Sequence, residues 1–258
     1  MMRKFIRYQF DGRTSYGILE GDTIQEIRGG LFGSGGSGGE PTGATRLLAD
    51  VKLLYPCEPP KILAVGLNYR SHLGARKVPD HPEMFYKPVS SLQNPGDPIE
   101  LPKDATNVHF EGELVAIIGR IARRVSPEAA RDAIFGVSCG NDVSEREWQH
   151  GATGKDLQWW RAKGSDTFAP LGPVIVTGLD YGNLLLQTRV NGEVVQKQYT
   201  SDLIFDLPTI VSWISQWVTL TPGDAIYTGT PGSTSKLKPG DVVEVDIENI
   251  GVLRNPVA

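Results

Sequence analysis

The chain has 258 residues, of which 40% are hydrophobic, and a formal net charge of −4 at pH 7. A chain of this length can bury a sizeable core without cross-links, and two cysteines far apart in sequence, Cys57 and Cys139, favour reduced thiols and a cytoplasmic protein over a disulfide framework or a zinc site. Interspersed charges argue against a nucleic-acid partner, and no apolar run is long enough for a signal peptide or a membrane span.

Residues 1–55 are predicted to form a small N-terminal β domain. Residues 3–27 alternate between apolar and polar side chains as strands do, with Ile6 and Tyr8 on one face. Residues 29–39 consist mostly of Gly and Ser, a composition that cannot bury enough surface to order itself. We expect a flexible loop there and place the domain linker in it, although an inserted segment would have a similar composition.

Residues 56–258 are predicted to form the larger, catalytic domain, mainly β with a few helices. Short apolar runs rich in strand-forming residues predict strands over 61–67, 108–119, 134–140, 173–177 and 241–248. Asn191-Gly192, between the runs 186–190 and 193–197, is a strong hairpin signal. Helices are predicted after Ser126-Pro127, a cap followed by proline at the first helical position, and over 210–218, where apolar residues recur at helical spacing.

Two acidic residues begin one of the predicted strands. Glu111 and Glu113 are two apart, so in a strand they share a face with the apolar side chains of Val115 and Ile117. Two carboxylates on a face that leads into a core repel each other and lose hydration, so they call for a cation or for protonation. A bare Glu-x-Glu is nevertheless more often a strand end with both side chains in water.

A third carboxylate strengthens the metal interpretation. The apolar run 134–140 ends on Asn141-Asp142, and the following residues 144–147 resemble a helix start, which leaves Asp142 at the mouth of the sheet. Asp142 alone is as well explained by a turn. Three carboxylates without cysteine, and without histidine at ligand spacing, suit magnesium, manganese or calcium better than zinc. His109 could be a ligand, but a structural or supporting role is favoured.

At this point the chain resembles the fumarylacetoacetate hydrolase family, whose catalytic domain is a mixed, rolled β-sheet. The resemblance extends from residue 61 to the C-terminus, and six segments in the family's order carry it. They are 65–72 (VGLNYRSH), 85–88 (FYKP), 111–113 (EGE), 141–149 (NDVSEREWQ), 163–173 (KGSDTFAPLGP) and 228–232 (TGTPG).

The resemblance implies a role for each matching residue. Glu111, Glu113 and Asp142 would bind Mg²⁺ or Mn²⁺, in agreement with the charge argument. Lys163 would stabilise negative charge on a ketone oxygen as it becomes an enolate. The remaining implied roles are substrate orientation by Arg146 and Gln149, three apart on a helix, and capture of the substrate's carboxylate by Thr230.

One departure concerns the acid–base element, which in the family commonly reads N-Y-x-x-H-x-x-E. The histidine is His72, but the position of the acid is Ala75. His72 could act alone as a base, Asp80 or Glu83 could supply the carboxylate, or the reaction could need no activated water. A His72 that merely packs is a further alternative.

The predicted function is metal-dependent hydrolysis of C–C bonds in small 2-oxo or β-diketo acids of the acylpyruvate or fumarylacetoacetate type, through a stabilised enolate. Oxaloacetate decarboxylation, and hydration or isomerisation of dienoic acids in aromatic catabolism, are alternatives within the family. A non-catalytic binding protein with the same fold is the alternative from another class. A homodimer is expected, because the family is commonly dimeric and rolled β domains leave edges to be covered.

Overall fold

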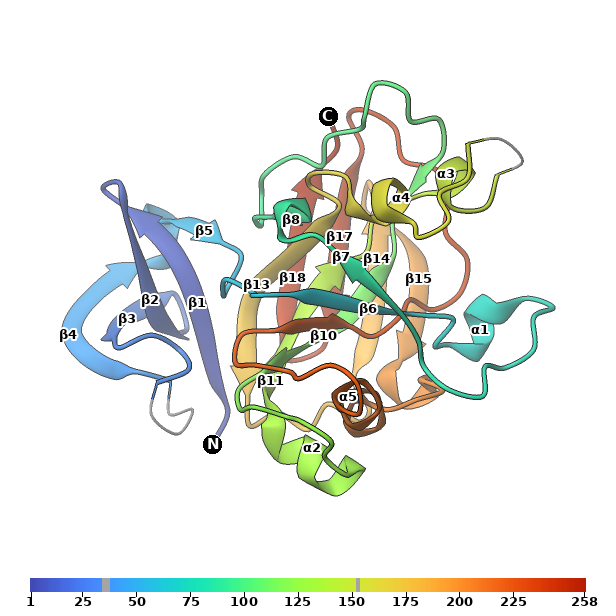
Figure 1. Cartoon of the computed structure of the whole chain (residues 1–258). Coiled ribbons are helices and arrows are strands. Elements are labelled where there is room, and N and C mark those ends of the chain that lie inside the picture. The colour runs from blue at the N-terminus through green and yellow to red at the C-terminus, as the bar shows by residue number, and fades with distance from the viewer. Residues whose placement is uncertain (34–37, 152–153) are drawn as a thin grey trace.

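The computed structural model describes residues 1–33, 38–151 and 154–258, and strands dominate it (Figure 1). The strands are β1 (Arg3–Phe10), β2 (Arg13–Glu20), β3 (Thr23–Arg28), β4 (Glu40–Leu47), β5 (Lys52–Leu54), β6 (Ile62–Gly66), β7 (Glu83–Lys87), β8 (Leu92–Gln93), β9 (Val108–His109), β10 (Gly112–Ile118), β11 (Ile134–Asn141), β12 (Ser144–Glu145), β13 (Ala169–Thr177), β14 (Leu185–Val190), β15 (Glu193–Tyr199), β16 (Ala225–Tyr227), β17 (Val242–Ile247) and β18 (Gly251–Pro256). The helices are α1 (Arg70–Leu73), α2 (Pro127–Ala133), α3 (Arg146–His150), α4 (Trp160–Gly164) and α5 (Leu207–Ser215), with single 3-10 turns at η1 (Leu48–Asp50), η2 (Val89–Ser91) and η3 (Thr200–Asp202). The predicted class, mainly β with a few helices, is confirmed.

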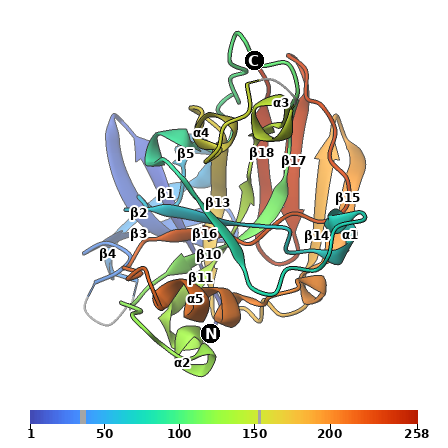
Figure 2. The same cartoon turned by 45° about the vertical axis from the view of Figure 1, so that its right-hand side comes forward.

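A mixed sheet of twelve strands runs through the whole molecule in the order β4-β3-β2-β1-β13-β11-β10-β16-β6-β7, with β5 beside β1 and β8 beside β13. Most of its pairs are antiparallel, whereas β16–β6 and β13–β8 are parallel. A second sheet, β15-β14-β17-β18, lies to the right of β10, β11 and β13 in the view of Figure 2. The predicted hairpin over β14 and β15 belongs to this second sheet.

The core lies on both faces of the large sheet, and β10 shows why. Its side chains alternate: Leu114 and Ala116 pack with Leu186 and Val245 of the second sheet, while the odd-numbered residues pack on the other face with Tyr227. Every residue of β10 is buried. A strand covered on both faces is expected to be apolar throughout, so Glu113 within β10 and the buried Glu111 just before it are exceptions that require partners.

The N-terminal strands β1 to β5 extend the large sheet, since β1 pairs with β13 (Figure 1). The Gly- and Ser-rich run lies between β3 and β4, which pair with each other. The linker predicted in this run is therefore wrong, because the run joins two strands of one unit. Residues 34–37 of the run lie outside the described residues, and the domain boundary at residues 55 and 56 stays a prediction.

The helices predicted after Ser126-Pro127 and over 210–218 are both present, and the ends of the second are shifted. α2 begins at Pro127, and the Ser126 hydroxyl accepts a hydrogen bond from the Ala129 amide at 3.4 Å. α5 begins at Leu207, earlier than predicted, because Asp206 caps it by accepting from the Thr209 amide at 2.9 Å. Within the described part of the chain, none of the helices is long and apolar enough to cross a membrane.

Antiparallel pairing brings the acidic segments together. Gly112, at the start of β10, is paired with Asn141, at the end of β11. The next residue outward on each strand is therefore Glu111 on one side and Asp142 on the other, and the Asp142 amide donates to the Glu111 carbonyl at 2.8 Å. The register of one strand pair thus creates the acidic end of the sheet.

Candidate active site

Three carboxylates meet at this end of the sheet. Each of Glu111, Glu113 and Asp142 offers one oxygen, and these oxygens all lie within 4.8 Å of one another. The residues are only 5%, 1% and 1% exposed, respectively. Buried carboxylates this close repel strongly unless cations or protons compensate them.

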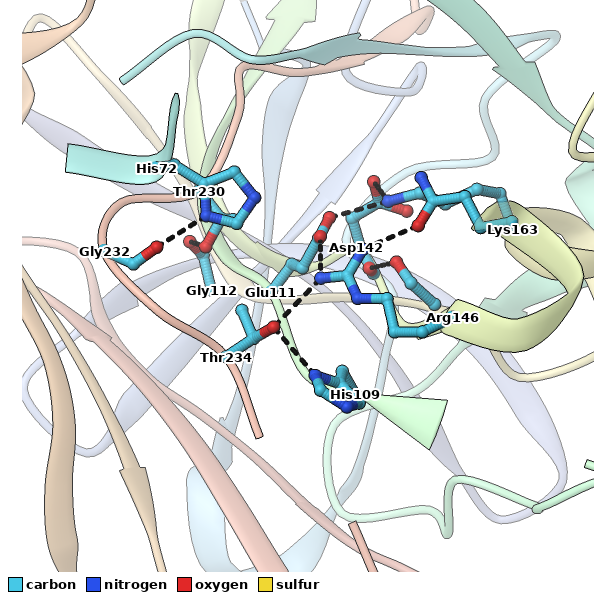
Figure 3. A network of polar contacts seen from close by, with 12 residues as sticks. His72, His109, Glu111, Gly112, Asp142, Arg146, Lys163, Thr230, Gly232 and Thr234 are labelled. Atoms are coloured by element: carbon cyan, nitrogen blue, oxygen red, sulfur yellow. Dashed lines mark hydrogen bonds and ion pairs between the residues drawn. The ribbon is translucent and has the colours of Figure 1, made fainter. Parts of the chain in front are cut away.

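Three cationic side chains surround the group. Lys163 Nζ, from α4, lies 2.6 Å from Glu111 Oε2 and 2.6 Å from Asp142 Oδ2. Lys87 Nζ, from the end of β7, lies 2.6 Å from Asp142 Oδ1 and also donates to the Lys163 carbonyl. Arg146, from α3, forms an ion pair with Glu111 (Figure 3). Glu111 and Asp142 are therefore neutralised by the protein itself.

Glu113 differs from the other two carboxylates. Its hydrogen bond is from the Gly229 amide to Oε2 at 2.8 Å, and no described lysine or arginine pairs with it. Burial, followed by the neighbouring charges of Asp142 and Glu111, raises its pKa well above the ordinary value. Burial alone would also raise the pKa of Glu111, but the charges of Arg146 and Lys163 outweigh burial and lower it.

This donor set fits a hard divalent cation. All three groups are carboxylates, the ligand type that Mg²⁺ and Mn²⁺ prefer, and the described residues place neither cysteine nor histidine with them. A cation beside Glu113 would supply the positive charge that this buried carboxylate lacks among its described neighbours. His109, the other ligand considered from the sequence, lies outside the group.

His72 is oriented by a backbone carbonyl. Its Nδ1 lies 2.6 Å from the Gly232 carbonyl oxygen, which can only accept, so Nδ1 carries the proton (Figure 3). A neutral imidazole then has its free lone pair on Nε2. His72 also lines the cleft above the carboxylates. The residue is therefore prepared to accept a proton through Nε2.

The acids proposed as partners of His72 are elsewhere. Asp80 forms an exposed pair with Lys77 at 3.2 Å, and Glu83 lies 3.8 Å from His81. Both are outside the lining of the cleft, so neither replaces the missing acid. The helix geometry expected around Ala75 is also absent, because α1 ends at Leu73 and Gly74 turns the chain with φ of 59°.

Arg146 is held in place by a chain of hydrogen bonds. It donates to Gln149 Oε1 at 2.7 Å, as expected for residues three apart on a helix, and to Thr234 Oγ1 at 3.0 Å. Thr234 in turn contacts His109 Nδ1 at 2.8 Å (Figure 3). His109 Nε2 contacts Asn107 Oδ1 at 2.9 Å. Burial, with Arg146 nearby, lowers the pKa of His109 to about 4. His109 is thus a neutral support for Thr234.

Thr230 lines the cleft, but its hydroxyl is already engaged. The hydroxyl donates to the Gly112 carbonyl at 2.9 Å and accepts from Gln196 Nε2 at 2.8 Å. The backbone amide of Thr230, unlike its hydroxyl, has no hydrogen-bond partner among the described residues. Any capture of a carboxylate here would use this N–H rather than the hydroxyl.

A cleft of about 970 Å³ contains all eight residues predicted for the site. Trp159 and Phe85 form an apolar part of its wall, and Arg76 and His150 line it as well. The sequence interpretation missed four contributors, which are Lys87, Gln196, Gly232 and Thr234. Lys87 and Gly232 lie within the family-like segments FYKP and TGTPG, which were usable signals. The contacts of Gln196 and Thr234 are made across the fold and leave no local pattern.

Comparisons with known proteins agree with this geometry. Residues 61–258 match the model of the fumarylacetoacetate (FAA) hydrolase C-terminal family, and residues 3–56 match the Rv2993c-like N-terminal family. The match to the first family covers well over half of the chain. The chain therefore belongs to the fumarylacetoacetate hydrolase family.

Three relatives illustrate the range of the family. Protein Rv2993c of Mycobacterium tuberculosis is 47% identical over 84% of this chain and 82% of its own length. The crystal structure of 2-hydroxyhepta-2,4-diene-1,7-dioate isomerase from Mycobacterium marinum has a TM-score of 0.90 and 42% identity, covering 99% of this chain and 98% of that one. The mitochondrial oxaloacetate tautomerase fahd2 of Xenopus laevis is 39% identical over 81% of this chain and 69% of its own length.

Proposed function

We propose that this enzyme moves a proton on the carbon next to the 2-oxo group of a small 2-oxo acid, as a tautomerase or isomerase. The orientation of His72 carries the proposal. Its Nδ1 proton is committed to the Gly232 carbonyl, so Nε2 is a base that faces the cleft. A tautomerase and an isomerase among the relatives support this choice.

The three carboxylates are proposed to bind Mg²⁺ or Mn²⁺, which would supply Lewis-acid polarisation of the substrate's 2-oxo group. Lys163 would act beside it. An ammonium group has three N–H donors, and two of them reach Glu111 and Asp142. The third is left to stabilise charge on an enolate oxygen at the cleft.

The substrate's first carboxylate is proposed to bind to Arg146 and Gln149, which line the cleft as one hydrogen-bonded unit. The amide of Thr230, which lines the same cleft, is a further donor. Charge-assisted bonds to a carboxylate fix both position and orientation. The 2-oxo acid would then present its neighbouring carbon to His72 Nε2.

C–C bond hydrolysis, the leading expectation from the sequence, becomes the second candidate. Hydrolysis needs an activated water, and no carboxylate among the described residues is hydrogen-bonded to His72 to stabilise its charged form. The Gly232 carbonyl nevertheless orients the imidazole ring, as the carboxylate of the family's acid–base pair would. Hydrolysis therefore remains a candidate. Decarboxylation and a purely binding role are separated by the same assays.

One set of assays tests the proposal. The purified protein is given oxaloacetate with Mg²⁺, Mn²⁺ or a chelator, and ultraviolet absorbance follows the enol while a coupled assay follows pyruvate. Rapid metal-dependent loss of the enol without pyruvate release supports tautomerisation. Pyruvate from oxaloacetate would indicate decarboxylation, and pyruvate from acetylpyruvate would indicate hydrolysis. No turnover of any of these acids, or of a dienoic 2-hydroxy acid, would contradict the proposed function.

We also propose that the chain is a homodimer. β7 is the last strand of the large sheet, and the large side chains of Tyr86, Trp160 and Trp217 are exposed near it, with 56%, 70% and 68% of their surface accessible. Unpaired strand edges with apolar neighbours are usually covered in solution. Light scattering tests this, and a 28.1 kDa species at micromolar concentration would contradict it.

A further inference from the structure

Two consecutive side chains of α1 hold the backbone of Gly232 from both sides. The Gly232 amide donates to Ser71 Oγ at 3.0 Å. The Gly232 carbonyl accepts from His72 Nδ1 at 2.6 Å (Figure 3). Among the described residues, the backbone of Gly232 makes no other hydrogen bond. The carbonyl that orients His72 therefore belongs to a residue that Ser71 also holds.

Hydrogen bonds, rather than packing, fix the conformation of Gly232. Its φ is 61°, in the left-handed region that glycine shares with several other accessible conformations. A Cβ at this position would meet no atom within 4 Å, so no neighbouring side chain restricts the rotation of the backbone. The preceding peptide is held at its carbonyl edge by Gln196 Nε2, which donates to the Pro231 carbonyl at 2.5 Å. Ser71 holds the N–H edge of the same peptide.

The direction of the Gly232 carbonyl decides where His72 carries its proton. In a neutral histidine the protonated ring nitrogen is set by the hydrogen bonds of the ring. While the carbonyl faces Nδ1, the proton stays on Nδ1 and Nε2 keeps its lone pair. If the carbonyl turned away, the proton would be free to occupy Nε2, and the base that faces the cleft would be lost.

We infer that Ser71 is a positioning residue, which fixes the Gly232 carbonyl and thereby keeps His72 in the tautomer with a basic Nε2. This inference rests on the proposed function, in which Nε2 accepts the substrate's proton. Ser71 occupies a variable position of the N-Y-x-x-H-x-x-E pattern, so the pattern itself assigns it no role. Acting through a backbone carbonyl, Ser71 would replace the orienting part of the role of the acid that is missing at Ala75.

NMR of the ring nitrogens in protein that carries isotope-labelled histidine measures the tautomer directly, at alkaline pH where imidazoles are neutral. The chain has four histidines, and H72Q identifies the signals of His72. The Nδ1–H tautomer is expected to predominate in the wild type. Ser71→Ala should shift the population toward Nε2–H and lower kcat about two- to tenfold with little change in KM, the range that one neutral hydrogen bond contributes. Ser71→Thr keeps the hydroxyl and should retain the wild-type tautomer and kcat.

Ser233→Ala is the matched control, because Ser233 is exposed, follows Gly232 directly and lines the same cleft, yet has no side-chain hydrogen bond among the described residues. It should change neither the tautomer nor kcat. Ser71 is also exposed, so Ser71→Ala is expected to fold, and an unchanged melting temperature verifies this.

The outcomes separate this inference from the proposed function. A tautomer shift in Ser71→Ala that is absent from Ser71→Thr and Ser233→Ala supports the positioning role. The inference is overturned if His72 of the wild type already carries its proton on Nε2, if Ser71→Ala keeps the wild-type tautomer whatever its kcat, or if Ser71→Thr is as altered as Ser71→Ala. A shifted tautomer with unchanged kcat on a confirmed substrate would overturn it as well. The tautomer is measured without substrate, so a wild type that turns over none of the acids would contradict only the proposed function.

Discussion

The two ends of the cleft are built differently. The floor, consisting of Lys87, Glu111, Glu113, Asp142 and Lys163, is buried, and almost every charged atom in it has a partner on another element. The rim, consisting of His72, Arg76 and His150, is partly or fully exposed and has one side-chain hydrogen bond among the described residues, from His72 to Gly232. A rigid, charge-balanced floor can support any reaction that passes through an enolate. The residues of an exposed rim can differ between family members with the substrate and the reaction. This division agrees with relatives that are named as an isomerase and a tautomerase.

The largest expected effect is on the floor. Lys87→Met would leave Asp142 Oδ1 and the Lys163 carbonyl without their buried donor. Removing one partner of a buried pair typically costs about 3–5 kcal/mol, so urea denaturation should show a loss of this size. The control is Lys52→Met, which breaks an exposed pair with Asp97 and should cost at most about 1 kcal/mol. Similar losses in both variants would contradict a charge-balanced floor.

The second-largest effect is expected on the catalytic rate. Lys163→Met keeps an unbranched side chain one atom shorter but removes the donor proposed for the enolate oxygen, so kcat should fall on the order of a hundredfold on any confirmed substrate. Lys197→Met, an exposed lysine on β15, serves as the control. Steady-state kinetics decide, and full activity of Lys163→Met would remove the enolate role. Metal binding by calorimetry shows separately whether the carboxylates still function.

The third effect is a dependence of protein stability on pH, caused by the protonation of Glu113. Its folded-state pKa is raised, so between the ordinary glutamate pKa and the raised value the folded state holds a proton that the unfolded state has lost. The stability of the chelator-treated protein should therefore decrease as pH rises through this window. Glu113→Gln, which is always neutral, should lack this part of the dependence. Thermal unfolding at several pH values measures it, and Mg²⁺ should stabilise the wild type more as pH rises, because it competes with the proton.

The smallest effect is expected at the rim. Ala75→Glu restores the residue type of the family's acid, but Gly74 ends α1 before this position, so the new carboxylate does not share a helix face with His72. We expect less than about a twofold change in hydrolysis of acetylpyruvate, because a base gains from an acid only within hydrogen-bond reach. The pH–rate profile should also stay unchanged. A tenfold or greater gain in the rate of hydrolysis would show that the backbone at the rim moves enough to bring the new carboxylate within hydrogen-bond reach of His72.

Much of the fold could be predicted from local pattern. Alternation in the N-terminal strands, the Asn191-Gly192 hairpin and the capped helix at Ser126 depend on neighbours a few residues away, and all three are present. The linker prediction failed because composition reports that a segment is flexible but not which elements it joins. Only the pairing of β3 with β4 shows that the Gly- and Ser-rich run lies within one unit.

For the candidate site, the sequence by itself determined the acidic group. Glu111 and Glu113 share a strand face by periodicity, and Asp142 ends a second apolar strand, so local patterns identify all three. The antiparallel register of β10 and β11 then places them at one edge. The tertiary structure decided the partners of His72 and Asp142. Gly232 is 160 residues from His72, and Lys87 is 55 residues from Asp142. A backbone carbonyl has no residue identity to detect, and a lysine in a strand becomes a buried counter-ion only when the fold closes over it.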